Sequence, residues 1–417
     1  MEESMIEVVT SEYAEEAPFL WLQRVSAFYA PNYSVQQIAD LDDRLAAHID
    51  GLRVAGHEGW KLLESSLDSK GSEDFFSAAV LALEAKDGRF EELIGRTKSA
   101  PEAVSGVISA LGWSSHKAIA GRMKSYLDDP SPIKQKLGIA ALGLHRQDIG
   151  PKLAQFLSAP VDSVRIRALR TAGQLGRQDV LRHTLAAITE PKPEARFWAG
   201  WSSVLLGDRA KALDTLVSIA LKPGPRQMRA LQLALHASDT KAGYELLLQL
   251  ADLPDALRIR IIGSGYVGDV RYAQWLVDQM AQPSVARIAG EAFVNITGAD
   301  FNLDQLETLP PEDFEDGPTE DPDDENVELP EDIALPWPDQ KKIQSWWDRN
   351  KSRFTVGNKY FLGQPVTRAH CIHVLKTGFQ RQRIAAALHM ALLNPGQPLF
   401  EWRAPAWRQK RWLETLK

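Results

Sequence analysis

The strongest candidate for chemistry is the run His370-Cys371-Ile372-His373. On a helix, its two histidines would share one face, which suits zinc ligands or a base beside a thiol nucleophile. A third ligand with comparable spacing is missing, because His389 is distant in sequence and neither HExxH nor CxxC occurs. We therefore interpret the run as part of an ordinary helix, with no metal site and no thiol catalysis.

A second candidate is the stretch from Gly263 to Gly268, which has the GxGxxG spacing of dinucleotide-binding loops. That motif needs a parallel strand before it, and no strand is indicated here. We interpret the stretch as a turn that ends a helix. The nine histidines form no serine, histidine and aspartate pattern that the sequence supports. The sequence therefore predicts a protein that is not an enzyme and has no cofactor.

The elements that carry these residues form an internal repeat. Between prolines, apolar residues follow helical spacing, as Val164, Ala168, Ala172 and Leu175 do. Each repeat is predicted to be a helix, a short polar turn and a second helix, with proline between repeats. The prolines are spaced by 29 to 32 residues and are Pro101, Pro130, Pro160, Pro191, Pro223, Pro254 and Pro283.

This pattern resembles short HEAT repeats of the phycobilisome-lyase-like type over residues 71–300, whereas ankyrin and tetratricopeptide signatures do not recur. An arginine recurs early in the first helix of successive repeats, at Arg165, Arg196, Arg229, Arg258 and Arg287. A ladder for nucleic acid is one interpretation. Residues 1–287 hold 33 basic and 35 acidic residues, so we favour pairing of each arginine with an aspartate or a helix C-terminus of the neighbouring repeat.

The flanks complete an all-α prediction: a HEAT-like α-solenoid with an N-terminal helical cap and a small C-terminal helical unit after an acidic linker. Residues 1–70 form the cap, with Ile38, Leu41, Leu45 and Ile49 on one helix face. Residues 71–300 form the repeats, 301–338 an acidic, proline-rich linker or arm, and 339–417 a basic, tryptophan-rich helical unit. The tryptophans there are expected to fill a small core.

Charge is divided unequally along the chain. Residues 288–340 hold 17 acids and no lysine or arginine, and residues 341–417 hold 15 bases and 3 acids. Either the acidic segment folds onto the basic tail, or each segment recognises an oppositely charged partner. We predict partner-binding roles, as a phosphate mimic if the partner is a nuclease, for Asp316, Glu320, Asp321, Asp323, Asp324 and Glu325.

Further motifs resemble one family of bacterial HEAT-like proteins that are encoded in type VI secretion clusters beside spike and toxin genes. The motifs are His48 to Trp60, Pro336-Trp337-Pro338 followed by Trp346-Trp347, Tyr360-Leu362-Gly363, Gly378-Arg381-Gln382-Arg383 and Ala404-Pro405-Trp407-Arg408. The resemblance implies a non-catalytic, cytoplasmic partner of secretion components. It is either an immunity protein that neutralises a co-encoded toxin, or an adaptor or chaperone that loads a toxin onto the spike.

Composition agrees with a soluble, cytoplasmic protein. The single cysteine, Cys371, favours a reducing compartment, the acidic N-terminus lacks the order of a signal peptide, and no run reaches the roughly 20 apolar residues that span a bilayer. Two alternatives to protein binding remain. A lyase-like role is one, because short HEAT units occur in chromophore lyases. Nucleic-acid binding through Lys341 to Lys417 is the other, and the adjacent acidic arm weighs against it.

Overall fold

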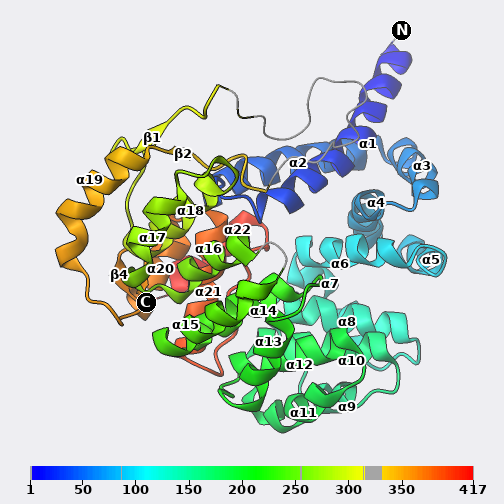
Figure 1. The fold of residues 1–417 in the computed structure, drawn as a ribbon. Coiled ribbons are helices and arrows are strands. Elements are labelled where there is room, and N and C mark those ends of the chain that lie inside the picture. Colours follow the sequence, from blue (N-terminus) through cyan, green and yellow to red (C-terminus); the bar gives the residue numbers. More distant parts are fainter. Residues whose placement is uncertain (1, 86, 254–255, 313, 315–330, 417) are drawn as a thin grey trace. The chain divides into compact units, whose positions relative to one another are not determined.

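A computed structural model describes residues 2–85, 87–253, 256–312, 314 and 331–416. Within these residues the chain consists of 22 α-helices, short 3-10 helices and turns, and four strands of two residues each (Figure 1). The protein is all-α and built from stacked helix pairs, as the sequence predicts. None of the described helices combines the length and apolarity that crossing a membrane requires.

Contacts divide the chain into two compact units. The first holds Met1–Tyr29, Tyr33–Thr184 and Gln397–Lys417, and the second holds Ala30–Asn32 and Leu185–Gly396. The first contains α1 (Glu2–Ala27), α2 (Val35–Ala55), α3 (His57–Ser66), η1 (Leu67–Ser69), α4 (Ser72–Ala85), α5 (Arg89–Arg96), η2 (Pro101–Ala103), α6 (Val104–Trp113), α7 (His116–Tyr126), α8 (Pro132–Leu144), α9 (Lys152–Leu157), α10 (Asp162–Leu175), η3 (Gln178–Val180) and α22 (Ala406–Thr415).

The predicted N-terminal cap corresponds to α1, α2 and α3. Helix α2 begins after Ser34, whose hydroxyl accepts from the Gln37 amide at 3.3 Å while the Gln37 side chain accepts from the Ser34 amide at 2.9 Å. This reciprocal capping box satisfies two amides that the helix itself leaves without acceptors. The face predicted from helical spacing is buried and consists of Ile38, Leu41, Leu45 and Ile49.

The helices of the first unit stack as consecutive repeats. The first helices of the pairs pack in chain order, α4 on α6, α6 on α8 and α8 on α10, and second helices such as α5 and α9 pack beside them. Pro101, Pro130 and Pro160 lie between one pair and the next. The predicted helical face of α10 is buried at Val164, Ala168, Ala172 and Leu175.

The second unit continues the same pattern. Helix α11 (Leu181–Ala186) crosses the boundary, and α12 packs on α14, α14 on α16 and α16 on α18. The elements are η4 (Ala187–Thr189), α12 (Pro193–Leu205), α13 (Lys211–Ala220), α14 (Gln227–Ala237), α15 (Thr240–Gln249), η5 (Leu250–Asp252), α16 (Ala256–Val267), η6 (Val270–Tyr272), α17 (Ala273–Gln279), α18 (Pro283–Thr297), β1 (Glu307–Thr308), β2 (Trp337–Pro338), α19 (Gln340–Asn350), η7 (Lys351–Arg353), β3 (Tyr360–Phe361), β4 (Gln364–Pro365), α20 (Arg368–Thr377) and α21 (Gln380–Leu393).

The small hairpin of β3 and β4 attaches to the last repeats of the second unit. Its turn residues Leu362 and Gly363 have positive φ, as tight hairpins require. Their amides donate to the carbonyls of Asn295 and Ile296 at 2.7 and 3.0 Å, so the hairpin satisfies carbonyls at the end of α18. Beyond it, α21 packs on α12 and α14.

The described ends of the predicted linker, residues 301–338, also pack in the second unit. Phe301 and Leu306 join the core that contains Ile343, Trp346 and Trp347. Strand β1 pairs with β2 in antiparallel register, Glu307 opposite Pro338. Residues 339–396 belong to the second unit by their contacts and 397–417 to the first, so the two-unit division cuts the chain elsewhere than the predicted boundaries. Those boundaries, at residues 70, 300 and 338, stay predictions.

Candidate functional site

The run His370-Cys371-Ile372-His373 lies in α20, as predicted. Cys371 is fully buried, and burial raises the pKa of its thiol to about 12, so the reactive thiolate is disfavoured. A ring nitrogen of His370 bonds the carbonyl of Phe361 at 2.8 Å. In the part of the chain that the structure describes, no group of three or more histidine, cysteine, aspartate or glutamate residues is placed to hold a metal ion. The run therefore has the contacts of ordinary helix residues.

The glycine-rich stretch is placed differently from the prediction. Gly263 and Gly265 lie inside α16 rather than in a turn. A Cβ at either position would press against Leu247 or Ala292 of a neighbouring helix, so close packing explains why these positions are glycine. Only Gly268 ends the helix, with a φ of +71°. The GxGxxG spacing thus arises from close helix packing followed by a helix end, and it makes no phosphate-binding loop.

The repeat arginines are largely used inside the fold. Arg165 pairs with Asp162 at 2.5 Å and donates to the carbonyl of Ala159 at 2.6 Å, at the end of the preceding repeat. Arg258 pairs with Asp332 at 2.9 Å, outside the repeats. The guanidinium groups of Arg229 and Arg287 lie over the rings of Trp198 and Trp337. The expected contact with the end of the neighbouring repeat is found for Arg165, whose aspartate partner lies in its own helix, and the tryptophan partners were not foreseen.

The structure does not describe the acidic residues that were predicted to bind a partner. Asp316, Glu320, Asp321, Asp323, Asp324 and Glu325 all lie outside the described residues. Their role stays a prediction that rests on composition.

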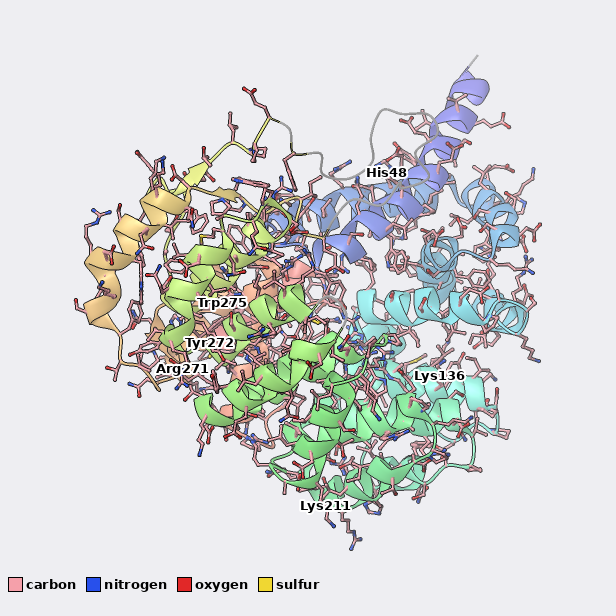
Figure 2. The ribbon with its side chains drawn as sticks, viewed as in Figure 1. His48, Lys136, Lys211, Arg271, Tyr272 and Trp275 are labelled. Carbon is pink, nitrogen blue, oxygen red and sulfur yellow. The ribbon has the colours of Figure 1, made fainter. Side chains whose placement is uncertain are left out.

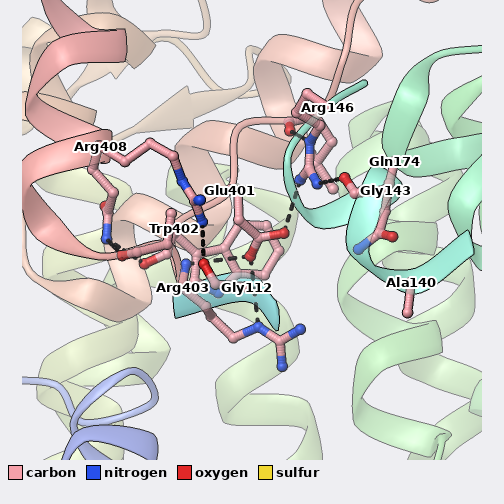
Figure 3. A network of polar contacts seen from close by, with 12 residues as sticks. Gly112, Ala140, Gly143, Arg146, Gln174, Glu401, Trp402, Arg403 and Arg408 are labelled. Atoms are coloured by element: carbon pink, nitrogen blue, oxygen red, sulfur yellow. Dashed lines mark hydrogen bonds and ion pairs between the residues drawn. The ribbon is translucent and has the colours of Figure 1, made fainter. Parts of the chain in front are cut away.

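A buried polar network in the first unit is centred on Glu401, which sequence reasoning did not single out (Figure 3). Its carboxylate pairs with Arg146 at 3.0 Å and with Arg403 at 3.6 Å, and Arg146 also donates to the carbonyl of Leu399 at 2.6 Å. The neighbouring Arg408 donates to the carbonyl of Gly112 at 2.6 Å. This network fastens the C-terminal segment, residues 397–417, to repeat helices of the same unit.

The network holds more cations than carboxylates. Burial by itself favours a neutral acid, but the charges of Arg146 and Arg403 outweigh it and lower the pKa of Glu401 to about 2. Burial, with the charge of Arg403, lowers the pKa of Arg167 to about 9, and its Nε has no acceptor among the described residues. The sequence signal was that Glu401 is one of only 3 acids in residues 341–417.

A surface pocket of about 220 Å³ lies on the second unit, between α15, α16 and the start of α17. We call it the Arg260 pocket. Three of its residues, on η6 and α17, are labelled in Figure 2. Its lining combines two arginines with aromatic and leucine side chains, and the residues are Tyr244, Leu247, Leu248, Arg260, Arg271, Tyr272 and Trp275.

The two arginines of the pocket differ in their partners. Arg271 pairs with the buried carboxylate of Asp269 at 2.7 Å and lies 5.3 Å from the ring centre of Tyr244. Arg260 lies 5.7 Å from the ring centre of Trp275 and has no carboxylate within ion-pair distance in the described chain. Among the described residues, one positive charge of the pocket is therefore left without a countercharge.

Comparison with known proteins bears on the repeats themselves. Residues 150–236 match the family model of HEAT repeats. The match runs from the turn before α9 to the end of α14, so it covers consecutive helix pairs of the described array. No curated protein matches the chain. HEAT repeats are commonly protein-interaction scaffolds, and nothing in this match concerns secretion, toxins or lyase chemistry.

Proposed function

We propose that this protein is a non-catalytic scaffold that binds another protein through its HEAT-like repeats. The observation that carries the proposal is the contrast between buried and exposed polar groups. The polar side chains that looked reactive, Cys371 and His370 among them, are buried or bonded within the fold. The Arg260 pocket, on the repeat surface, combines aromatic rings with an arginine that has no carboxylate partner among the described residues. Stacked helix pairs offer extended surfaces that bind partners without reactive groups.

In its finer form, the proposal is an immunity protein of a type VI secretion cluster that neutralises a co-encoded toxin in the cytoplasm. The family resemblance of the motifs described above supports this form. The alternative within the same class is an adaptor or chaperone that loads the toxin onto the secretion spike. Both functions need a stoichiometric protein complex, and they differ in whether spike components join it.

The acidic arm has a defined part in this proposal. If the toxin is a nuclease, its cleft is basic, and the carboxylates from Asp316 to Glu325 enter it in place of phosphates. Replacing the six proposed carboxylates by their amides should then weaken the complex and flatten its dependence on salt. The matched control replaces exposed acids elsewhere, such as Glu58 and Glu414. Unchanged affinity would show that the arm does not bind the toxin, and the repeat surface would remain as the proposed binding surface.

The test of the function is capture of the tagged protein from its native host under type VI inducing conditions, at two salt concentrations, followed by mass spectrometry. A cluster-encoded toxin held in a stoichiometric complex is the expected result, and protection of cells that co-express toxin and this protein would establish immunity. Arrival of a spike protein in the complex would favour the adaptor. Capture of neither protein, with nucleic acid or a small molecule instead, would overturn the proposal.

The basic composition of residues 341–417 suggests nucleic-acid binding, but the contacts of several of its basic side chains weigh against it. Arg383 donates to the carbonyl of Leu375 in the core, and Arg381 pairs with Glu291 at 2.8 Å. The Nζ of Lys359 donates to three carbonyls at and just beyond the end of α14. Such groups are occupied within the fold and offer little to phosphates. Absence of binding to random duplex at low salt would count further against this alternative.

A further inference from the structure

We propose that the Arg260 pocket binds an acidic peptide segment of the protein partner, with one large apolar side chain seated against its aromatic rings and a neighbouring carboxylate on Arg260. The inference rests on the proposed protein-binding function and specifies the chemistry that one surface recognises. It depends on three observations: an unpaired cation, an unpartnered hydroxyl and the size of the pocket.

Arg260 has no carboxylate partner in the described chain, unlike two neighbouring arginines of the second unit. Arg226 pairs with Glu194 at 2.6 Å, and Arg258 pairs with Asp332 at 2.9 Å. Arg260 follows Arg258 by two residues, and its only recorded partner within the described chain is the ring of Trp275. Charge-assisted hydrogen bonds from a guanidinium to a carboxylate are stronger than neutral ones. A carboxylate of the ligand would therefore bind more strongly at Arg260 than a neutral group would.

The unpartnered hydroxyl belongs to Tyr272. Its oxygen is buried and has no hydrogen-bond partner in the described chain. Burial, moderated by the charge of Arg271, raises the pKa of Tyr272 to about 12, so it is a donor at neutral pH. The nearby Asp269 carboxylate is already occupied by the backbone amide and Nε of Arg271 and by the amide of Gly357. A ligand oxygen that reaches this hydroxyl would supply the acceptor that the described chain lacks.

The apolar part of the pocket fits one side chain. Leu247 is buried on the inner side, while Leu248 and Tyr244 are 48% and 38% exposed at the rim. The volume of about 220 Å³ is below the roughly 300–1,000 Å³ that is usual for pockets of small molecules and cofactors. A single phenylalanine, leucine or methionine side chain of a peptide therefore suits it better than a dinucleotide or another large ligand.

A nucleic-acid base is the competing occupant, because aromatic rings beside arginine also stack bases. Single-strand binding needs a basic groove that follows successive phosphates, whereas this pocket offers one guanidinium that has no countercharge in the described part of the chain. The formal charge of the whole chain, −7, also disfavours a polyanion. An acidic peptide needs only the one uncompensated cation and a seat for its apolar side chain.

The test measures binding of the full-length protein to a fluorescein-labelled peptide in which one phenylalanine is flanked on both sides by glutamates. Fluorescence anisotropy should give a dissociation constant on the order of 10 μM that rises with salt. A peptide with serine for phenylalanine, and one with glutamines for the glutamates, should each bind about tenfold more weakly. A fluorescent oligothymidylate is the probe for the competing occupant.

Two protein variants assign the binding to the pocket. Arg260→Gln removes the unpaired cation and should lower the affinity for the peptide about tenfold. Arg182→Gln changes an exposed arginine of α11 and should leave the affinity unchanged. Tyr272→Phe removes only the hydroxyl. Because that hydroxyl has no partner among the described residues, its removal should not lower the melting temperature, yet it should weaken binding of the peptide several-fold.

The outcomes separate this inference from the proposed function. Peptide affinity that is equal in the wild type and in Arg260→Gln, or oligothymidylate binding that requires Arg260, would overturn the pocket assignment even if a toxin is captured from the host. Peptide binding that requires Arg260 and Tyr272, without any captured toxin or spike protein, would support the pocket and overturn the secretion-linked function. Loss of both peptide and toxin binding in Arg260→Gln supports both.

Discussion

Glu401 is a single carboxylate surrounded by guanidinium groups, and its effect on stability follows from that imbalance. Without its charge, Arg146 is left buried and the partly exposed Arg403 loses its carboxylate, beside Arg167, whose Nε already lacks an acceptor in the described chain. Breaking a buried pair by removing one partner costs more than the pair itself contributes, because an uncompensated charge stays behind.

We therefore expect Glu401→Gln to lower the free energy of unfolding by about 3–5 kcal/mol at pH 7, measured by urea denaturation. The pKa of Glu401 is about 2 in the folded protein and roughly 4.3 when unfolded, so its stabilising effect is present above pH 4.3 and is lost as the pH falls towards 2. The variant should lack this pH dependence. Glu414→Gln, at an exposed position, is the control, and an equal effect of both substitutions would contradict the prediction.

One pair of residues illustrates why the partners of individual side chains were hard to predict from the sequence. Glu401 and Arg146 are 255 positions apart, and nothing in their local sequence marks them as partners. Arg260 was not singled out either, because an arginine on a repeat helix is unremarkable until the fold shows that no described carboxylate faces it. By contrast, the position of Cys371 within a helix was predictable, because it depends on local sequence.

At the scale of elements, the end of α16 shows how one glycine joins a repeat to a distant hairpin. Gly268 has a φ of +71°, and its carbonyl accepts from the amide of Tyr360 in β3 at 2.7 Å. A Cβ at Gly268 would collide with the carbonyl oxygen of Tyr360. The position therefore excludes a side chain for two reasons, the backbone conformation and the close approach of β3.

We expect Gly268→Ala to lower the free energy of unfolding by about 3 kcal/mol, as the sum of left-handed strain and displacement of β3. Gly357→Ala is a matched control, because Gly357 has a φ of +90° but no heavy atom within 4 Å of the added Cβ. That control should cost only about 1 kcal/mol. Equal losses in thermal or urea unfolding would show that the hairpin contact contributes nothing.

The helices themselves were largely predictable. The apolar spacing in α2 and α10 gave the faces that the structure buries, since a helix brings residues three and four apart to one side. The interpretation of Gly263 and Gly265 as a turn was wrong, because glycine inside a helix is also selected by close packing of neighbouring helices.

At the scale of the molecule, the C-terminal segment belongs to the first unit although it follows the second in sequence. Leu399, Phe400 and Trp402 are buried, and Ala406 joins the core formed by Phe28 and Ile38. The amide of Ala406 also donates to the carboxylate of Asp42 at 2.6 Å. Residues from the two ends of the chain thus complete one core.

A chain that ends at Gly396 should therefore lose stability in the first unit above all. Hydrogen exchange measured by mass spectrometry should become faster in α2, at the end of α1 and at the end of α8. The removed segment packs on Ala27 and Ile38 and pairs with Arg146, just after α8. A chain that ends after Glu414 is the control and should exchange as the full-length protein does. Unchanged protection in α2 after the longer truncation would contradict this account.

The sequence by itself determined the helical repeats, their proline boundaries and the separation of charge, because these depend on local spacing and composition. Only the tertiary structure decided which residues meet: Glu401 with Arg146, the Tyr360 amide with Gly268, and residues 397–417 with the first unit. It also showed that Arg260 faces no carboxylate of the described chain. Such contacts join positions far apart in the chain, and a helical period carries no information about the partner on the other side.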